Sequence, residues 1–98
     1  MVDEDTRALL VAVGANITRL RKHRAMTQAD LAEAADCETN YLQKLEYGTA
    51  VPSLPMLVRV AKTLDVPVAV LFRASKPRKN ERGRPSTARA KQKPRIRA

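Results

Sequence analysis

The sequence predicts an all-α protein, a compact domain of five helices followed by a disordered basic tail. Between residues 6 and 72, apolar residues recur at spacings of three and four, and no segment shows the alternation of a strand. After Phe72 the only large apolar residue is Ile96, so residues 73–98 cannot bury enough surface to offset the entropy of ordering. We therefore expect a domain at residues 1–72 and an arm at 73–98.

The first helix is expected from Thr6 to about Arg24, with Asp5 or Thr6 as its N-cap. Its apolar face carries Leu10, Val13, Ile17 and Leu20. Gly14 lies inside this helix, where glycine costs roughly 1 kcal/mol relative to alanine. It marks either a close contact or the point where a frayed first turn joins the packed helix.

Two short helices are expected next, separated by a tight turn. The run Thr27-Gln28-Ala29-Asp30 predicts a capping box that opens a helix from Gln28 to about Ala35. A further helix is expected over Thr39–Tyr47, with Leu42 and Leu45 facing inward and Gly48 ending it in the left-handed conformation.

Proline and serine residues mark where the last two expected helices begin. Ser53 is a good N-cap, and Pro55 is tolerated in a first turn. The fourth helix would then bury Leu57, Val60, Ala61 and Leu64. Asp65-Val66 ends it, and Pro67 at a first helical position opens a short fifth helix through Phe72.

The charge of the chain is concentrated at its C-terminal end. The 98 residues include 19 Lys and Arg against 10 Asp and Glu, a net charge of +9. Residues 1–72 hold 8 basic and 9 acidic groups, whereas residues 73–98 hold 11 basic groups and one acid. The expected domain is therefore near neutral at −1, and the arm carries +10.

The composition excludes several classes of protein. No apolar run approaches 18 residues, so no membrane span is expected, and the acidic start Met1–Asp5 is unlike a signal peptide. One cysteine, Cys37, and one histidine, His23, form neither an internal disulfide nor the usual zinc site. Because no nucleophile or phosphate-loop spacing is present, we expect no enzyme, no cofactor and no metal, but a cytoplasmic, nucleoid-associated binding protein.

The two short helices carry the functional prediction. The turn between Gln28–Ala35 and Thr39–Tyr47 is too short to let them lie antiparallel, which is the geometry of a helix-turn-helix whose second helix enters the major groove of DNA. The exposed face of that second helix carries side chains able to read base edges: Thr39, Asn40, Gln43 and Lys44. Four nearby basic residues would add local charge: Arg19, Arg21, Lys22 and Arg24.

Several motifs recur along the domain at characteristic distances: Val13 through Arg21, Met26-Thr27-Gln28-Ala29-Asp30-Leu31-Ala32, Tyr41 through Gly48, Pro52-Ser53 and Leu57 through Phe72. Together they resemble the Cro/CI-type (XRE) helix-turn-helix domain of phage repressors and bacterial regulators. The resemblance covers about 60 of the 98 residues. Asp36 replaces the turn glycine of the family, and Glu38 replaces the usual Ser or Thr cap.

The resemblance implies a five-helix domain that acts as a homodimer on palindromic operators in double-stranded DNA. Gln28 would bind a phosphate, Thr39, Asn40 and Lys44 would read bases, and Gln43 would lie beside them. Arg21 and Glu46 would form an internal ion pair. The dimer contact would use Val68, Leu71 and Phe72, unless these residues complete the monomer core.

The arm contains Arg82-Gly83-Arg84-Pro85, which matches the core of an AT-hook. An extended Arg-Gly-Arg fits a narrow A·T minor groove, where both guanidinium groups meet a strongly negative potential. The other interpretation is a generic phosphate-binding tail. In both cases the arm should supply nonspecific DNA affinity that falls with salt.

These observations predict a sequence-specific transcriptional regulator, most simply a repressor, with Arg82 and Arg84 as additional DNA contacts. One alternative is an antitoxin- or antiactivator-like module that binds a protein partner and represses its own gene. Another is a nucleoid-type architectural protein in which the arm dominates.

Overall fold

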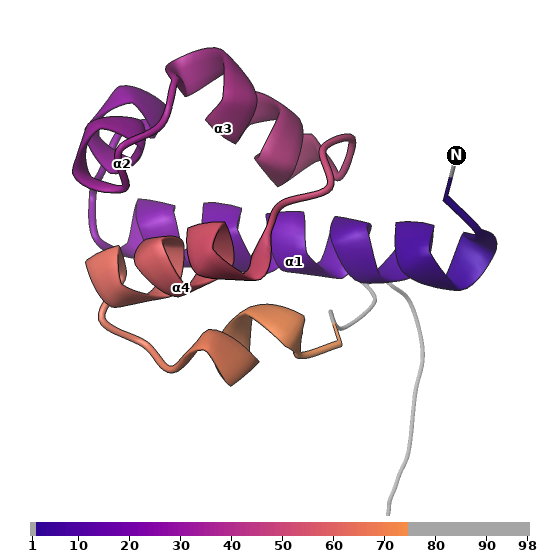
Figure 1. Ribbon diagram of the computed structural model, residues 1–98. Helices are drawn as coiled ribbons and strands as arrows, with labels where there is room; N and C mark the ends of the chain where they lie inside the picture. The colour runs from indigo at the N-terminus through magenta and orange to yellow at the C-terminus, as the bar shows by residue number, and fades with distance from the viewer. Residues whose placement is uncertain (1, 75–98) are drawn as a thin grey trace, which may run out of the picture.

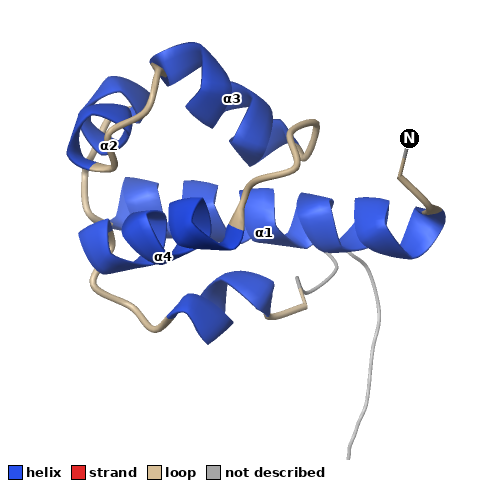
Figure 2. Ribbon diagram, viewed as in Figure 1, coloured by secondary structure: helices blue, strands red, loops and turns tan. Residues whose placement is uncertain are grey.

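The computed structural model describes residues 2–74, which fold into four α-helices and one 3₁₀ helix (Figure 1). The elements are α1 Glu4–His23, α2 Gln28–Ala34, α3 Thr39–Tyr47, α4 Leu54–Thr63 and the 3₁₀ helix η1 Val68–Phe72. Helices and loops account for the whole of this range, as Figure 2 shows, and the expected all-helical class is confirmed. The arm residues 75–98, including Arg82 and Arg84, lie outside the described residues.

The expectation of five α-helices is wrong in its last element. The segment after Pro67 is a 3₁₀ helix, in which the Val70 amide donates to the Pro67 carbonyl at 3.0 Å and the Arg73 amide to the Val70 carbonyl at 3.3 Å. Five residues are too few for a stable α-helix, and short connecting helices commonly take this tighter form. Pro67 is the N-cap of η1 and not its first helical residue.

The long helix α1 packs against α3 and η1, whereas α2 packs on α3, and α4 packs on η1 and α2. Helix α1 runs the length of the molecule, with α2 and α3 on one side of it and η1 on the other (Figure 1). It begins two residues earlier than predicted, because the Asp3 carboxylate caps it by accepting from the Thr6 amide at 2.7 Å. Glu4 and Asp5 then lie in the first turn, where negative charge suits the helix dipole.

The predicted helix signals in the middle of the chain are confirmed. Thr27 and Asp30 form a capping box at the start of α2, and Ser53 caps α4 by accepting from the Met56 amide. Gly48 ends α3 with φ of 80°. Asp36, in the turn between α2 and α3, also takes the left-handed conformation, with φ of 61°.

The core is formed by the apolar faces that the sequence predicts, with one addition. Ile17 of α1, Leu31 of α2, Leu42 of α3 and Leu64 after α4 are each 2% exposed or less. Leu71 of η1 is 0% exposed and joins the same cluster. Leu71 therefore completes the monomer core, and its side chain is withdrawn from the surface that the resemblance assigns to the dimer.

A buried asparagine fixes the end of the domain against α1. Asn16 is 5% exposed, and its Nδ2 donates to the carbonyl oxygens of Leu71 at 2.8 Å and Arg73 at 2.9 Å. Its Oδ1 accepts from Nη2 of Arg19 at 3.3 Å. These bonds satisfy a polar group that burial would otherwise penalise, and they hold the chain beside α1 where the arm begins.

Gly14 marks the closest approach of α1 to α3. A Cβ atom built at this position would lie 2.3 Å from the Glu46 carbonyl oxygen and 2.6 Å from that of Leu45. Both are backbone atoms, which cannot move away as the end of a side chain could. Of the two interpretations that the sequence allows, the close contact is the correct one.

No helix within residues 2–74 is both long and apolar enough to cross a membrane.

Replacing Gly14 by Ala should lower the free energy of unfolding by about 2 kcal/mol, because α1 and α3 must separate to admit the methyl group. Urea unfolding followed by circular dichroism would measure this. Helix propensity alone predicts the opposite sign, a gain of about 1 kcal/mol. Stabilisation by Gly14→Ala would therefore contradict the close contact, and Ala15→Gly on the exposed side of the same turn gives the propensity effect alone.

Candidate nucleic-acid interface

The interface begins with the packing of α3 on α2 and α1. Leu42 and Leu45 face inward and are at most 1% exposed, and Glu46 is buried beside them, so the opposite face of α3 is turned outward. Asn40 and Lys44 are exposed, whereas Thr39 and Gln43 are partly buried at the edge of the same face. The four candidate base-reading residues thus lie together on the outer side of α3.

An ion pair holds α3 to α1 behind this face. Nε of Arg21 lies 2.7 Å from Oε2 of Glu46, and Nη2 donates to Oε1 at 3.2 Å. The same guanidinium donates from Nη1 to the Met26 carbonyl at 2.8 Å, in the loop before α2. The two side chains that the resemblance pairs are therefore in contact, at 10% and 3% exposure.

The environment of Glu46 favours its ionised form. Burial by itself would raise the pKa of this carboxyl group, but hydrogen bonds from Arg21 and Gln28 and the charge of Arg21 act against it. The balance holds the pKa of Glu46 below its ordinary value, so the group is a carboxylate at neutral pH.

Two candidate DNA contacts are connected to this ion pair. Nε2 of Gln28 donates to Oε1 of Glu46 at 3.0 Å, and Nε2 of Gln43 donates to Oε1 of Gln28 at 3.2 Å. The sequence does not predict the contact between Gln28 and Gln43, because they are 15 residues apart and lie on different helices. Gln43 is linked to Glu46 through Gln28, and this link exists only because α2 and α3 pack side by side.

The arginines that the sequence offered as local charge also have structural roles. Besides Arg21, Arg24 donates from Nε to the Leu64 carbonyl at 3.2 Å and lies 3.7 Å from the Asp65 carboxylate. Arg59 of α4, which is not one of those arginines, also donates from Nε to the Ala35 carbonyl at 3.0 Å. These groups join α1 and α4 to neighbouring loops, which reduces their availability for DNA.

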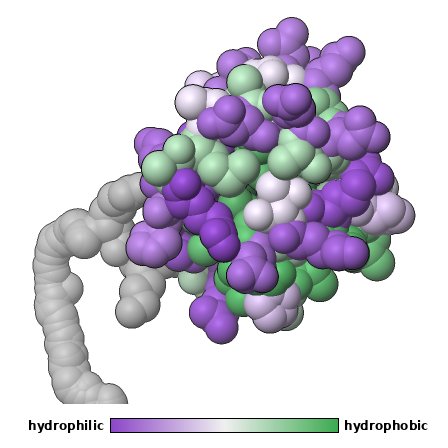
Figure 3. All heavy atoms as spheres, turned by 90° about the vertical axis from the view of Figure 1, so that its left-hand side faces the viewer, coloured by the Kyte–Doolittle hydropathy of each residue, from purple (hydrophilic) through white to green (hydrophobic). Residues whose placement is uncertain are grey.

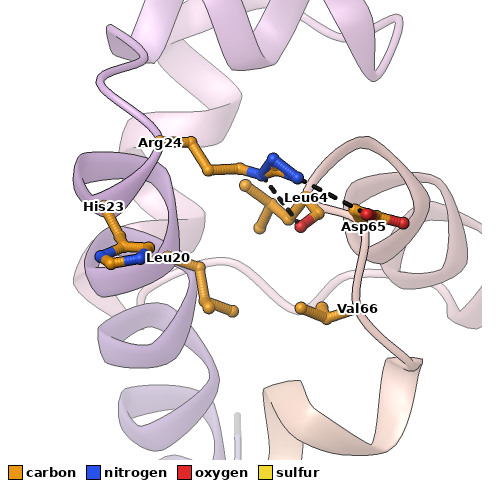
Figure 4. A pocket seen from close by; sticks show the side chains of 6 residues that line it. All are labelled: Leu20, His23, Arg24, Leu64, Asp65 and Val66. Atoms are coloured by element: carbon orange, nitrogen blue, oxygen red, sulfur yellow. Dashed lines mark hydrogen bonds and ion pairs between the residues drawn. The ribbon is translucent and has the colours of Figure 1, made fainter.

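Arg24 also lines a shallow pocket between the ends of α1 and α4 (Figure 4). The other lining residues are Leu20, His23, Leu64, Asp65 and Val66. None of the candidate DNA contacts within residues 2–74 lines this pocket.

The α2–α3 segment has an acidic charge balance. Residues 27–53 contain five acids and one base, Lys44. Only Glu46 among these acids has an ion-pair partner within the described range. Figure 3 views the molecule from the α2 side, where hydrophilic residues cover much of the face, weakly hydrophobic ones cross its middle, and strongly hydrophobic ones show at its lower edge.

The candidate dimer residues differ in exposure. Phe72 is 36% exposed, Val68 is partly buried against the core, and Leu71 is buried. Larger apolar exposure occurs elsewhere, at Tyr47 (75%), Val51 (65%) and Leu54 (63%). The apolar surface that η1 offers for a dimer contact is therefore smaller than the sequence suggested.

Replacing Glu46 by Gln should lower the free energy of unfolding at pH 7 by roughly 3 kcal/mol, because it leaves the Arg21 guanidinium buried without a counter-charge. The folded-state pKa of Glu46 is depressed, so its stabilisation is present above about pH 4.3 and is lost as pH falls through the folded-state value. Urea unfolding at a series of pH values should show the gap between wild type and variant narrowing below about pH 4. Glu33→Gln, at an exposed site on α2, is the matched control; an equal gap at pH 7 and pH 3 would contradict the charge effect.

Comparison with known proteins finds relatives that are transcriptional regulators. The chain is 38% identical over 61 residues to the immunity repressor protein of Bacillus phage phi105, a match that covers 62% of this chain and 42% of the repressor. It is 36% identical over 53 residues to the HTH-type transcriptional regulator PrpR of Mycobacterium tuberculosis, covering 54% of this chain and 11% of PrpR. The chain thus spans less than half the length of either curated relative.

Solved structures share the fold over most of the described residues. The restriction-modification controller protein C.AhdI from Aeromonas hydrophila superposes with a TM-score of 0.63 at 28% identity, covering 64% of this chain and 96% of that one. The biofilm regulator SinR, solved in complex with DNA, superposes with a TM-score of 0.60 at 32% identity, covering 62% and 98%.

The helix-turn-helix family model HTH_3 matches residues 17–71, more than half of the chain. This range contains α2, α3, α4 and most of η1, together with the Arg21–Glu46 pair. The chain therefore belongs to the HTH_3 family of helix-turn-helix proteins, the XRE or Cro/CI-like group that its motifs resemble.

Proposed function

We propose that this protein is a sequence-specific DNA-binding transcriptional regulator, most simply a repressor, that places α3 in the major groove. The observation that carries this proposal is the outer face of α3, where Thr39, Asn40, Gln43 and Lys44 lie together on a helix held rigidly from behind. Asn and Gln pair with adenine, and Lys donates to guanine, so this set can discriminate bases. The phage immunity repressor and DNA-bound SinR among its relatives support the same interpretation.

Gln28 is proposed to bind a phosphate of the DNA backbone. It lies at the first position of α2, and its Nε2 keeps one N–H beyond the bond to Glu46. A phosphate accepts hydrogen bonds only, so this N–H suits it. Such a contact would position α3 without reading sequence.

The arm is proposed to supply most of the positive charge for phosphate contacts, in addition to the contact from Gln28. The α2–α3 segment repels DNA at long range, because Lys44 is its only base against five acids. Residues 73–98 bring ten net positive charges, and Asn16 holds the start of that segment beside α1. Arg82 and Arg84 are the proposed minor-groove contacts within it.

A homodimer on a palindromic operator fits the geometry of this class. Two copies of α3 would enter successive major grooves about 34 Å apart on one side of the duplex. Phe72, with part of Val68, is the apolar surface that η1 offers for this contact, and Leu71 is not part of it.

Replacing Asn40 by Ala should weaken binding to the best operator by about 1–3 kcal/mol, and the loss should be confined to one base pair of each half-site. Binding titrations of the full chain against a panel of single-base operator variants would measure it. Uniform weakening on all sequences would show that Asn40 does not read a base.

Removing the arm after Ala74 should reduce affinity for random DNA on the order of tenfold or more. It should also flatten the salt dependence of binding by about 0.9 in log–log slope for each DNA phosphate that the arm neutralises. The truncation keeps the Asn16 bonds to Leu71 and Arg73. Titrations of both forms on specific and random DNA across a salt series provide the test. An unchanged slope would refute the role of the arm, whereas loss of all sequence preference would favour an architectural protein.

A further inference from the structure

We propose that Glu46 acts as a positioning residue for base recognition, by fixing the polarity of the Gln28 and Gln43 amides so that Gln43 favours adenine over guanine. The inference rests on the proposed function, in which α3 lies in the major groove. It assigns a preference for adenine to Gln43. Glu46, which would not touch DNA itself, would set that preference through Gln28.

The polarity starts from the ion pair. The Arg21 guanidinium donates twice to Glu46, at 2.7 and 3.2 Å, so the glutamate is a carboxylate that can only accept. The Gln28 atom 3.0 Å from Glu46 Oε1 must therefore be the amide nitrogen. Oε1 of Gln28 is consequently turned away from Glu46.

The same argument sets the next amide. Oε1 of Gln28 is an acceptor, so the Gln43 atom 3.2 Å from it must be the nitrogen Nε2. If the Gln43 amide were reversed, its oxygen would face the Gln28 oxygen and a hydrogen bond would become a repulsion. The chain of bonds thus runs in one direction, from Gln43 to Gln28 to Glu46.

Gln43 keeps one N–H and its Oε1 without a partner among residues 2–74. One donor beside one acceptor is the pattern with which glutamine binds the N7 and N6 groups of adenine. Guanine presents two acceptors, N7 and O6, at the same edge. In either orientation the Gln43 amide would place Oε1 against N7 or O6 of guanine. Reading guanine would therefore need both N–H groups of Gln43, and one of them is committed to Gln28.

Asn40 provides the contrast within the same helix. It is exposed and has no hydrogen bond from its amide to the described part of the domain. Its amide is free to turn either way. The polarity constraint therefore applies to Gln43 alone of the two carboxamides on α3.

The test uses the full chain and its best operator, with each base tried at each position. Wild type should prefer adenine to guanine by on the order of 10- to 100-fold at the position read by Gln43. Gln43→Met removes the amide while keeping the length of the side chain, so the preference at that position should disappear. Gln28→Met keeps the Gln43 amide but releases it, so the adenine-to-guanine ratio should fall at the same position.

Gln28→Met should also weaken binding uniformly, because methionine cannot donate to a phosphate, and the ratio separates this effect from the change of specificity. Glu46→Gln should lower the same ratio, because an amide in place of the carboxylate accepts either orientation of Gln28. Circular dichroism shows whether Glu46→Gln is folded. If Glu46→Gln does not fold, the change of the adenine-to-guanine ratio in Gln28→Met decides the test. Asn40→Ala is the control, since it should change a different position and leave this ratio intact.

Two results would overturn the inference while leaving the proposed function standing. One is uniform weakening by Gln28→Met with the adenine preference retained, and the other is an unchanged preference at every position in Gln43→Met. A wild-type chain that bound all sequences alike would overturn the proposed function itself, and this inference with it.

Discussion

The contact between Arg21 and Glu46 is the interaction on which the rest of the structure depends. It joins α1 to α3, and through the Met26 carbonyl it also holds the loop that leads into α2. Glu46 in turn accepts from Gln28 at the start of α2. Three helices therefore meet at one carboxylate, which is stable only because it stays ionised and every one of these donors points at it.

The close approach of α1 and α3 makes this geometry possible. Gly14 lets the α3 backbone come within a distance that no side chain would allow, at the carbonyl groups of Leu45 and Glu46. The Glu46 side chain is thereby brought within reach of Arg21, two turns further along α1. Gly14 of α1 and the Arg21–Glu46 ion pair between α1 and α3 therefore act together to fix the orientation of α3.

Charge and specificity are separated along the chain. The α2–α3 segment presents hydrogen-bonding side chains but an acidic balance, and the arginines around it are occupied by carbonyl groups and carboxylates of the domain. The positive charge lies in residues 73–98. In the proposed function, a helix α3 with little charge of its own would favour base reading over nonspecific phosphate binding.

The sequence by itself determined the local features of this protein. The capping box of Thr27 and Asp30, the Ser53 cap, the Gly48 terminus and the period of the apolar faces depend on residues within one or two turns, so the sequence suffices to predict them. The Asp3 cap was missed by two residues, and the last helix was assigned the wrong type, because a helix end depends on small differences between neighbouring hydrogen bonds. The tertiary structure alone decided that Leu71 lies in the core, that Asn16 binds the end of the domain, and that Gln43 donates to Gln28. Each of these joins residues that are distant in sequence, and the direction in which a side chain points across such a contact is set by the packing of helices and not by any local pattern.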